Sequence, residues 1–435
     1  MSLQRHYCGK LDEELYTATL SGGFELWMMP KKGARQTVAQ LSVASGVIHQ
    51  MEGRYGVGVA HMLEHLLFEK PEGEIAQRFA DLGGDINAST GLEGTEYVLT
   101  CGVGVEECVP LLFELVFDGR WTEERLDRER EIIASEIGLY GDDPEWVGYY
   151  SSLSNAYGNH PIAWEIAGDQ SLVETLDTGF LQRWHQTFYR PNNIAFFVAG
   201  DFEVRGFLSA CETALRQYAL PCSPRGMELI NPLSECPPCQ DATEKWASIE
   251  LPIRNAQVFI ALPDLLTAGE GRNVQRELAL ELSLDMVLGP TCDAYVALYE
   301  AGLVAGDTFA ADVCMESTCG FLLISAETAD PQAFTRETFD ALSHSFRRAD
   351  FEGDIDRAKK KMYGQLVRSF ETPEGCVHLM EAARQLGASG PFDYMEALDT
   401  LTSEGVFDQW KQGVGHLGGG VALILPPRGG QYELK

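Results

Sequence analysis

The chain has 435 residues, and its 33 Lys and Arg against 65 Asp and Glu give a formal net charge of −32. This acidic balance argues against binding to nucleic acid, which requires a basic face, and against binding to an anionic membrane surface. Hydrophobic residues make up 45% of the chain, yet no run approaches the roughly 18 apolar residues of a membrane span. We therefore expect a folded protein with no nucleic-acid partner and no membrane partner.

The N-terminus and the cysteines indicate the compartment. The opening sequence MSLQRHYCGKLDEEL lacks the apolar core of a secretory signal. The cysteines number eleven, and an odd count without a signal is typical of reduced thiols, so we expect a cytoplasmic protein. The only CxxC, Cys236–Cys239, lacks the second pair that a structural zinc site needs.

Periodicity predicts the elements of the first half in chain order. Residues 37–47 and 95–103 alternate apolar and polar side chains, which predicts half-buried antiparallel strands. Helical spacing of the apolar residues predicts helices at 57–68, 74–82, 105–117, 122–140, 171–187 and 203–218.

Residues 220–243 gather five prolines and show no sustained apolar period. This composition is typical of a linker. We therefore predict an N-terminal α+β domain over residues 1–220, a linker over 221–244 and a C-terminal α+β domain over 245–435.

The second half repeats the order of the first. The same patterns predict strands at 255–263 and 319–327 and helices at 273–289, 292–300, 331–347 and 354–371. The segment AQRFADLGGDINAST followed by TEYVLTC also resembles DAYVALYEAGLVAGDTF followed by CGFLLIS. The fold class that follows is α+β, with two similar halves that each form an antiparallel sheet with helices packed on one face. Chance similarity of two α+β halves is the alternative.

The segment VGVAHMLEHLLF, residues 57–68, carries the chemistry. His61, Glu64 and His65 stand at i, i+3 and i+4, so on a helix they share one face. Two imidazoles one turn apart can bind one divalent cation, and zinc suits nitrogen ligands. Glu64 beside them can take a proton from a water at the metal. The pattern is the inverted HxxEH form of the HExxH zinc helix. The alternative is an amphipathic helix with two histidines on its polar face, but the apolar flanks make buried ionisable groups that need a partner.

A third zinc ligand is expected from RLDREREIIASEIGLYGDDPE, residues 125–145. Glu129 and Glu136 lie seven residues apart and share a helix face, so one can ligate while the other orients a histidine or a water. Glu131 points away from that face. The predicted buried stripe of this helix consists of Ile132, Ile133 and Ile137. A charged surface helix with i,i+4 pairs is the alternative for any single glutamate here.

HMLEH followed by SEI within EREIIASEIGLYGDDPE resembles the pitrilysin/insulinase/mitochondrial-processing-peptidase family, and most closely its short bacterial members. Further motifs follow in order: GGDINAST with TEY (83–97), YGNHPIAWEIAGD (157–169) and FYRPNNIAFFVAGDF (188–202). The likeness covers about residues 14–205 and is thinner over 245–370. The family fold, two similar α+β halves per chain, agrees with the duplication.

The resemblance implies one Zn²⁺ per chain on His61, His65 and Glu136, with Glu64 as general base. It also implies that Glu129 is a catalytic-centre carboxylate near the metal. Asn87 and Ala88 match the edge strand to which an extended peptide substrate adds by main-chain hydrogen bonds, a pairing that accepts many sequences. The alternative for Asn87 is a turn residue after Gly83–Gly84.

This sequence departs from the family at two positions, and the departure bears on which partner chain it needs. Active members or their partner chains carry an arginine and, six residues later, a tyrosine that help to bind substrate; here Tyr299 and Ala305 stand at those positions. Neither can replace the arginine or the phenol. We therefore expect a heterodimer with a homologous non-catalytic chain that supplies the pair, or a homodimer, in either case closing into a clamshell around a chamber.

The expected activity is that of a zinc-dependent endopeptidase acting on short or unfolded peptides or on one precursor peptide. The alternative is a non-catalytic structural or binding subunit of a processing-peptidase-like complex, since some family members have lost catalysis. The intact HMLEH and Glu136 favour the peptidase.

Overall fold

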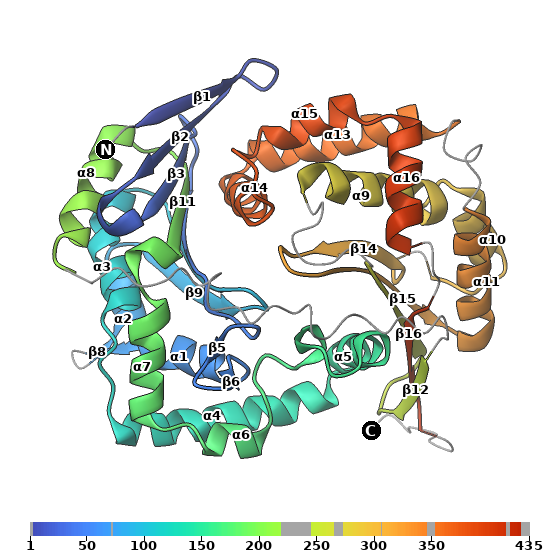
Figure 1. Cartoon of the computed structure of the whole chain (residues 1–435), viewed down its shortest axis with the longest axis horizontal. Coiled ribbons are helices and arrows are strands. Elements are labelled where there is room, and N and C mark those ends of the chain that lie inside the picture. Colours follow the sequence, from blue (N-terminus) through green and yellow to red (C-terminus); the bar gives the residue numbers. More distant parts are fainter. Residues whose placement is uncertain are drawn as a thin grey trace.

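The computed structural model describes residues 3–70, 73–218, 245–264, 273–305, 307–345, 353–414 and 418–427, which form two halves that each contain one large β-sheet (Figure 1). The predicted linker at 221–244, with Cys236 and Cys239, lies outside these ranges, and the domain boundaries stay a prediction. Within the described ranges no helix has both the length and the apolar character that a membrane crossing requires.

The first half is built on a seven-stranded sheet. Its strands, in spatial order, are β1 (Gln4–Cys8), β2 (Glu13–Thr19), β3 (Glu25–Pro30), β11 (Ile194–Gly200), β4 (Thr37–Val43), β10 (Thr95–Cys101) and β9 (Gly84–Thr90). Two small hairpins, β5–β6 (Gln50–Met51 with Arg54–Tyr55) and β7–β8 (Glu69–Lys70 with Gly73–Glu74), lie outside it.

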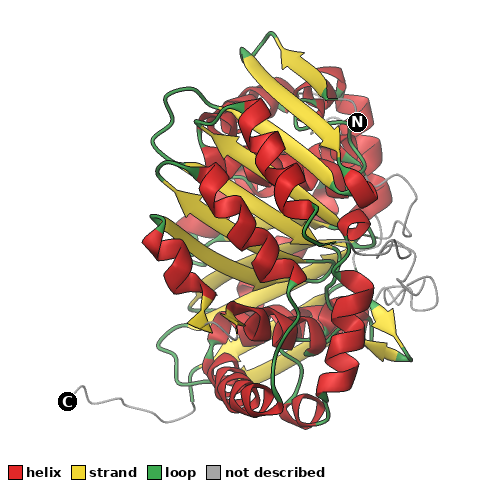
Figure 2. Ribbon diagram, turned by 90° about the vertical axis from the view of Figure 1, so that its left-hand side faces the viewer, coloured by secondary structure: helices red, strands yellow, loops and turns green. Residues whose placement is uncertain are grey.

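One face of this sheet is covered by helices of the same half, which lie across the sheet in Figure 2. They are α1 (Val59–Phe68), α2 (Ile75–Asp81), α3 (Val105–Phe117), α7 (Thr178–Phe188) and α8 (Val204–Leu215). The helix α4 (Glu123–Asp142) packs on α1, and α6 (Gln170–Glu174) packs on α4, so both lie beyond this layer (Figure 1). The helix predicted at 171–187 is therefore two helices. The break occurs because the Asp177 side chain accepts a hydrogen bond from the Phe180 N–H and starts α7 anew.

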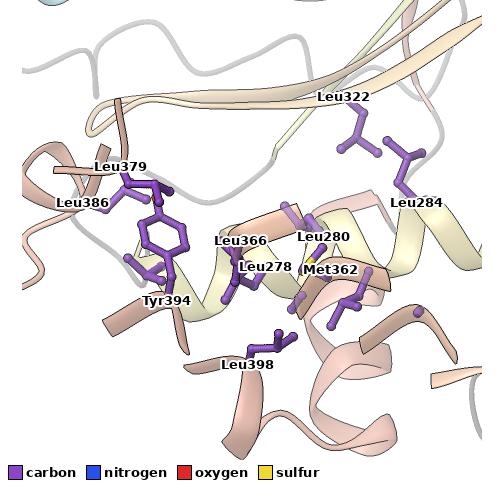
Figure 3. Packing of buried hydrophobic residues seen from close by; sticks show 14 of the residues in the cluster. Leu278, Leu280, Leu284, Leu322, Met362, Leu366, Leu379, Leu386, Tyr394 and Leu398 are labelled. Atoms are coloured by element: carbon purple, nitrogen blue, oxygen red, sulfur yellow. The ribbon is translucent and has the colours of Figure 1, made fainter. Parts of the chain in front are cut away.

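The second half is built on a five-stranded sheet in the order β12 (Lys245–Glu250), β16 (Gly420–Leu425), β13 (Ala256–Pro263), β15 (Gly320–Thr328) and β14 (Ala310–Met315). Its helices are α9 (Val274–Leu288), α10 (Asp293–Glu300), α11 (Pro331–His344), α13 (Ile355–Glu371), α14 (Pro373–Gln385), α15 (Asp393–Thr400) and α16 (Ser403–Val414). Figure 3 shows α9 at the centre of this core, where Leu278 lies near Leu366 while Leu284 faces Leu322 of the sheet.

The two halves have the same sheet topology, which confirms the predicted fold class. In space β3–β11–β4–β10–β9 corresponds strand for strand to β12–β16–β13–β15–β14. In each set the first two strands are parallel neighbours and all other neighbours are antiparallel. The strands β1 and β2 extend only the first sheet.

The halves also exchange one helix each. The helix α5 (Pro144–Tyr157), which follows α4, packs on the second face of the C-terminal sheet, and α14, which follows α13, packs on the second face of the N-terminal sheet (Figure 1). The approach of α5 is close, since a Cβ at Gly148 would lie 2.1 Å from the ring of Phe259. On the other side, the Gln40 side-chain amide donates to Glu381 of α14 over 2.5 Å. Each sheet thus has both faces covered only when the two halves are together.

Candidate metal centre

The helix α1 presents His61, Glu64 and His65 on one face. It starts after Gly58, whose φ of 69° is the left-handed conformation that favours glycine. The rest of the helix is anchored in the core by side chains at the intervening positions, namely Val59, Met62, Leu63, Leu66 and Leu67. The three functional side chains are therefore held by the packing of α1, and His61 is only 8% exposed.

The helix α4 runs beside α1 and brings in Glu136. The hydroxyl of Thr122 accepts from the Arg125 N–H over 3.2 Å and caps its start. Ile133 is buried on its inner face, whereas Ile132 is 45% exposed, so the predicted burial of Ile132 is wrong. The two residues are about 100° apart around the helix, and only the side of Ile133 faces α1 and the core.

Three ligand atoms converge between these helices. His61 Nε2 and His65 Nε2 are 3.3 Å apart, and Glu136 Oε2 lies 3.8 Å from the first and 3.5 Å from the second. A tetrahedral zinc ion with bonds of about 2.0–2.2 Å separates its ligand atoms by roughly 3.4 Å. Within the described ranges this is the only group of His, Cys, Asp and Glu whose ligand atoms approach so closely.

The chemistry of the three side chains fits a bound cation. Burial, and then the charge of His65, lower the pKa of His61 to about 4, so its imidazole is neutral at pH 7, as a metal ligand must be. Glu136 Oε2 is buried and accepts no hydrogen bond from any described residue, although it faces the two imidazoles. A buried carboxylate oxygen in that position needs a positive partner, and two imidazoles, which lose their protons when they ligate, together with one carboxylate are a ligand set that zinc binds.

Glu129 fixes the orientation of His65. Its Oε2 lies 2.8 Å from His65 Nδ1, the ring nitrogen on the far side from the cluster, and its Oε1 pairs with Arg125 at 3.0 Å. Glu129 is 3% exposed. Burial raises the pKa of its carboxyl, but the hydrogen bond from His65 and the charge of Arg125 outweigh burial and lower the pKa below its ordinary value. Glu129 thus contacts His65 and is not itself part of the His61–His65–Glu136 cluster.

Glu64 lines a cavity of 230 Å³, and His61 lines the same cavity. The hydroxyl of Thr90 donates to Glu64 Oε2 and holds the carboxylate on this side of the helix. Burial raises the pKa of Glu64 above its ordinary value. The other side chains that line the cavity are Ala88, Ser89, Thr90, Tyr140, Trp146, Ile166 and Ala167.

Asn87 and Ala88 lie on β9, the outermost strand of the seven-stranded sheet. The side of β9 that faces away from β10 is therefore not paired with any strand of the described ranges. The Asn87 side-chain oxygen accepts from the Ala88 N–H over 2.9 Å, so that the N–H of Ala88 points away from β10. The structure thus brings Ala88 to the wall of the same cavity as Glu64.

The positions that depart from the family lie elsewhere. Tyr299 is 57% exposed on α10, and Ala305 is also exposed. Figure 1 shows α10 at the outer edge of the second half, far from α1. Tyr299, on α10, therefore lies away from the His61–His65–Glu136 cluster of its own chain.

Sequence reasoning missed Thr90, Tyr140 and Trp146, whose side chains line the cavity. The last of these lies on α5, a helix that was not predicted. Its start carries a usable signal, since Asp143 accepts from the Glu145 and Trp146 N–H groups as N-cap and Pro144 follows at the first helical position. Tyr140 stacks on Trp146 with ring centroids 4.2 Å apart, so α4 and α5 meet at the cavity.

The chain is similar in sequence to one protein family and to a bacterial protein. Residues 28–170 match the family model described as Insulinase (Peptidase family M16). The chain is 28% identical over 407 residues to the uncharacterized zinc protease YmfH of Bacillus subtilis, which covers 91% of this chain and 93% of that protein.

Solved structures share the fold. An M16-like peptidase from Alicyclobacillus acidocaldarius superposes with a TM-score of 0.87 at 24% identity, covering 96% of this chain and 99% of that one. A peptidase M16 inactive domain from Pseudomonas fluorescens superposes with a TM-score of 0.76 at 17% identity, covering 97% of this chain and 100% of that one. The motifs, the fold and these relatives together show that the chain is similar to the insulinase family of peptidases, family M16, over residues 28–170 and is similar in length to the bacterial protein YmfH.

Proposed function

We propose that this chain is a zinc-dependent endopeptidase that hydrolyses short or unfolded peptides. The observation that carries the proposal is the shared cavity: His61, Glu64 and Ala88 of the edge strand β9 all line it. Hydrolysis of an extended peptide needs a cluster of metal ligands, a carboxylate and an unpaired strand edge in one place.

His61, His65 and Glu136 would hold the zinc ion, one per chain, and Glu129 would keep His65 in the orientation that binds it. Zinc, when bound, supplies a Lewis acid that polarises the scissile carbonyl and lowers the pKa of water. Glu64 accepts the proton of the attacking water and then donates it to the leaving amine, two steps that one carboxyl can perform from the same cavity.

Asn87 and Ala88 would bind the substrate backbone. An extended peptide laid along β9 would pair with the outward N–H and C=O groups of that strand, which selects for extension and not for sequence. In this arrangement the Ala88 N–H exchanges its bond with the Asn87 side chain for one with the peptide.

The active form is proposed to be a dimer that closes as a clamshell around an internal chamber. The residues at positions 299 and 305 support this, because a tyrosine and an alanine lack the side-chain chemistry of the arginine–tyrosine pair, and Tyr299 lies on α10, away from α1. Either a homologous non-catalytic chain supplies the pair, or a homodimer works without it. The proposed location is the cytoplasm, which agrees with the eight described cysteines, all of which have free thiols.

Mass spectrometry of a mixed peptide pool tests the proposal. The zinc-loaded parent chain and Glu64→Gln are incubated with the pool side by side. Cleavage by the parent and not by the variant supports a self-sufficient metallopeptidase. If neither cleaves although both bind zinc, adding the homologous chain of the same cell decides between a two-chain peptidase and a non-catalytic subunit, because only the first then cleaves.

A further inference from the structure

The carboxylate of Glu93 joins the two halves beside the candidate site. Glu93 lies in the turn between β9 and β10 and is 9% exposed. Its Oε2 accepts from the Ser317 N–H at 3.3 Å and the Ser317 hydroxyl at 2.6 Å. Its Oε1 accepts from the Thr318 N–H at 2.8 Å and the Thr318 hydroxyl at 2.5 Å. Four donors on one buried carboxylate define its position closely.

Ser317 and Thr318 form the turn between β14 and β15, the strands that correspond to β9 and β10 in the second half. The two equivalent turns of the duplicated fold therefore meet through Glu93. The receiving turn is anchored in its own half, because the Tyr157 hydroxyl of α5 donates to the Gly320 carbonyl over 2.5 Å.

The turn that carries Glu93 is also held on its other side. The N–H groups of Val47 and Ile48 donate to the carbonyls of Gly91 and Leu92 at 3.2 and 3.1 Å. The Leu92 side chain packs on the small apolar cluster between α5 and β15. The turn that carries Glu93 is therefore held by Val47 and Ile48 of the first half and by the packing of Leu92 on the α5–β15 cluster.

The position of this turn matters for β9. Among the described strands β9 pairs with β10 alone, so contacts other than strand pairing must fix its ends. Thr90, the last residue of β9, donates to Glu64 and lies three residues before Glu93. A shift of the turn would therefore move the strand edge relative to Glu64.

We propose that Glu93 is a positioning residue that holds the peptide-binding edge of β9 in place relative to Glu64 by clamping the β9–β10 turn to the β14–β15 turn. This role rests on the proposed function, because it assigns Glu93 to the binding of the same extended peptide. The conformation of the strand edge, and not the metal, is what the clamp preserves.

The test replaces Glu93 by glutamine, which keeps one acceptor oxygen but turns an NH₂ group toward two donors. The matched control is Glu25→Gln. It removes another contact between the halves, the 2.7 Å pair of Glu25 on β3 with Arg384 on α14, but four strands away from β9. The substrate is a peptide of the pool that the parent cleaves.

For Glu93→Gln we expect KM to rise about tenfold while kcat changes less than about threefold, since a loosened edge weakens main-chain pairing. Zinc content should stay at the parent's value. Amide hydrogen exchange should accelerate in residues 84–94 for Glu93→Gln and not for Glu25→Gln. Ser317→Ala combined with Thr318→Val removes two of the four donors from the other half and should raise KM in the same direction.

The outcomes are distinguishable. A parent that cleaves no peptide, alone or with its homologous partner, overturns the proposed function and this inference with it. A cleaving parent whose KM and amide exchange are the same in Glu93→Gln overturns the inference alone. An equal rise of KM in Glu25→Gln also overturns it, because the effect would then report general loosening of the halves.

Discussion

Glu129 Oε2 lies 2.8 Å from Nδ1 of His65, which leaves Nε2 of the same ring 3.3 Å from His61 Nε2 and 3.5 Å from Glu136. The carboxylate thus selects the tautomer in which Nδ1 carries the proton and Nε2 is free to ligate. Arg125, one turn before Glu129 on α4, in turn fixes the carboxylate.

Replacing Glu129 by glutamine should therefore weaken zinc binding. The amide can still accept from His65 Nδ1 but no longer carries the charge that strengthens this bond. We expect a loss of about tenfold, at the lower end of the 10–100-fold range for partners of metal ligands. Competition with a chromogenic chelator measures the affinity. Glu131→Gln, an exposed position on the same helix, is the control and should leave the affinity unchanged. Equal affinities for Glu129→Gln and the parent would contradict the role.

The stability of the junction between the halves should depend on pH through Glu96. Glu96 on β10 faces Glu381 of α14, and burial, followed by the charge of Glu381, raises the pKa of Glu96 to about 8. In the unfolded chain the carboxyl releases its proton near pH 4.5. The stabilising contribution of the protonated group is therefore complete below pH 4.5 and is lost as the pH rises through 8.

Glu96→Gln, which stays neutral, should raise the melting temperature relative to the parent at pH 8 and change it little at pH 5. Thermal unfolding followed by circular dichroism at the two pH values checks this. Glu107→Gln, an exposed carboxyl on α3, is the control and should shift both values alike. A parent and a Glu96→Gln variant with parallel pH profiles would show that Glu96 is not protonated in the folded state.

The packing of α5 on the second sheet should not tolerate an added methyl group at Gly148. Because the new Cβ would meet the Phe259 ring at 2.1 Å, Gly148→Ala should lower the free energy of unfolding by about 1–3 kcal/mol. The control is Gly364→Ala on α13, where a Cβ meets nothing within 4 Å. An alanine inside a helix should there raise stability by about 0.5–1 kcal/mol. Denaturant unfolding of the two variants measures both effects, and a stable Gly148→Ala would contradict the close approach of α5.

Local periodicity predicted the parts of the site that depend on a single helix. His61, Glu64 and His65 share a face because of i, i+3 and i+4 spacing alone, and Glu129 and Glu136 do so through i, i+7 spacing. The same reasoning failed for Ile132, since three isoleucines in six residues cannot all face one side of a helix. Periodicity identifies an apolar face but not which neighbour covers it.

The exchange of α5 and α14 could not be predicted for this reason. Each helix has an apolar face, and nothing in its own sequence states that it packs on the sheet of the other half. Trp146 therefore reaches the cavity, and Glu381 reaches Gln40, only through a tertiary arrangement. The hydrogen bonds of Glu93 with Ser317 and Thr318 likewise join residues more than 220 positions apart in the chain, so no local sequence pattern predicts them.

Titration of zinc-free protein with Zn²⁺, while the cleavage of one reporter peptide is followed, tests whether this chain is a zinc-dependent peptidase. Activity should rise in proportion to bound zinc, reach a plateau at one ion per chain, and be absent at every point in Glu64→Gln although that variant binds the same ion. Cleavage by the zinc-free parent, or equal cleavage by zinc-loaded Glu64→Gln, would contradict this expectation.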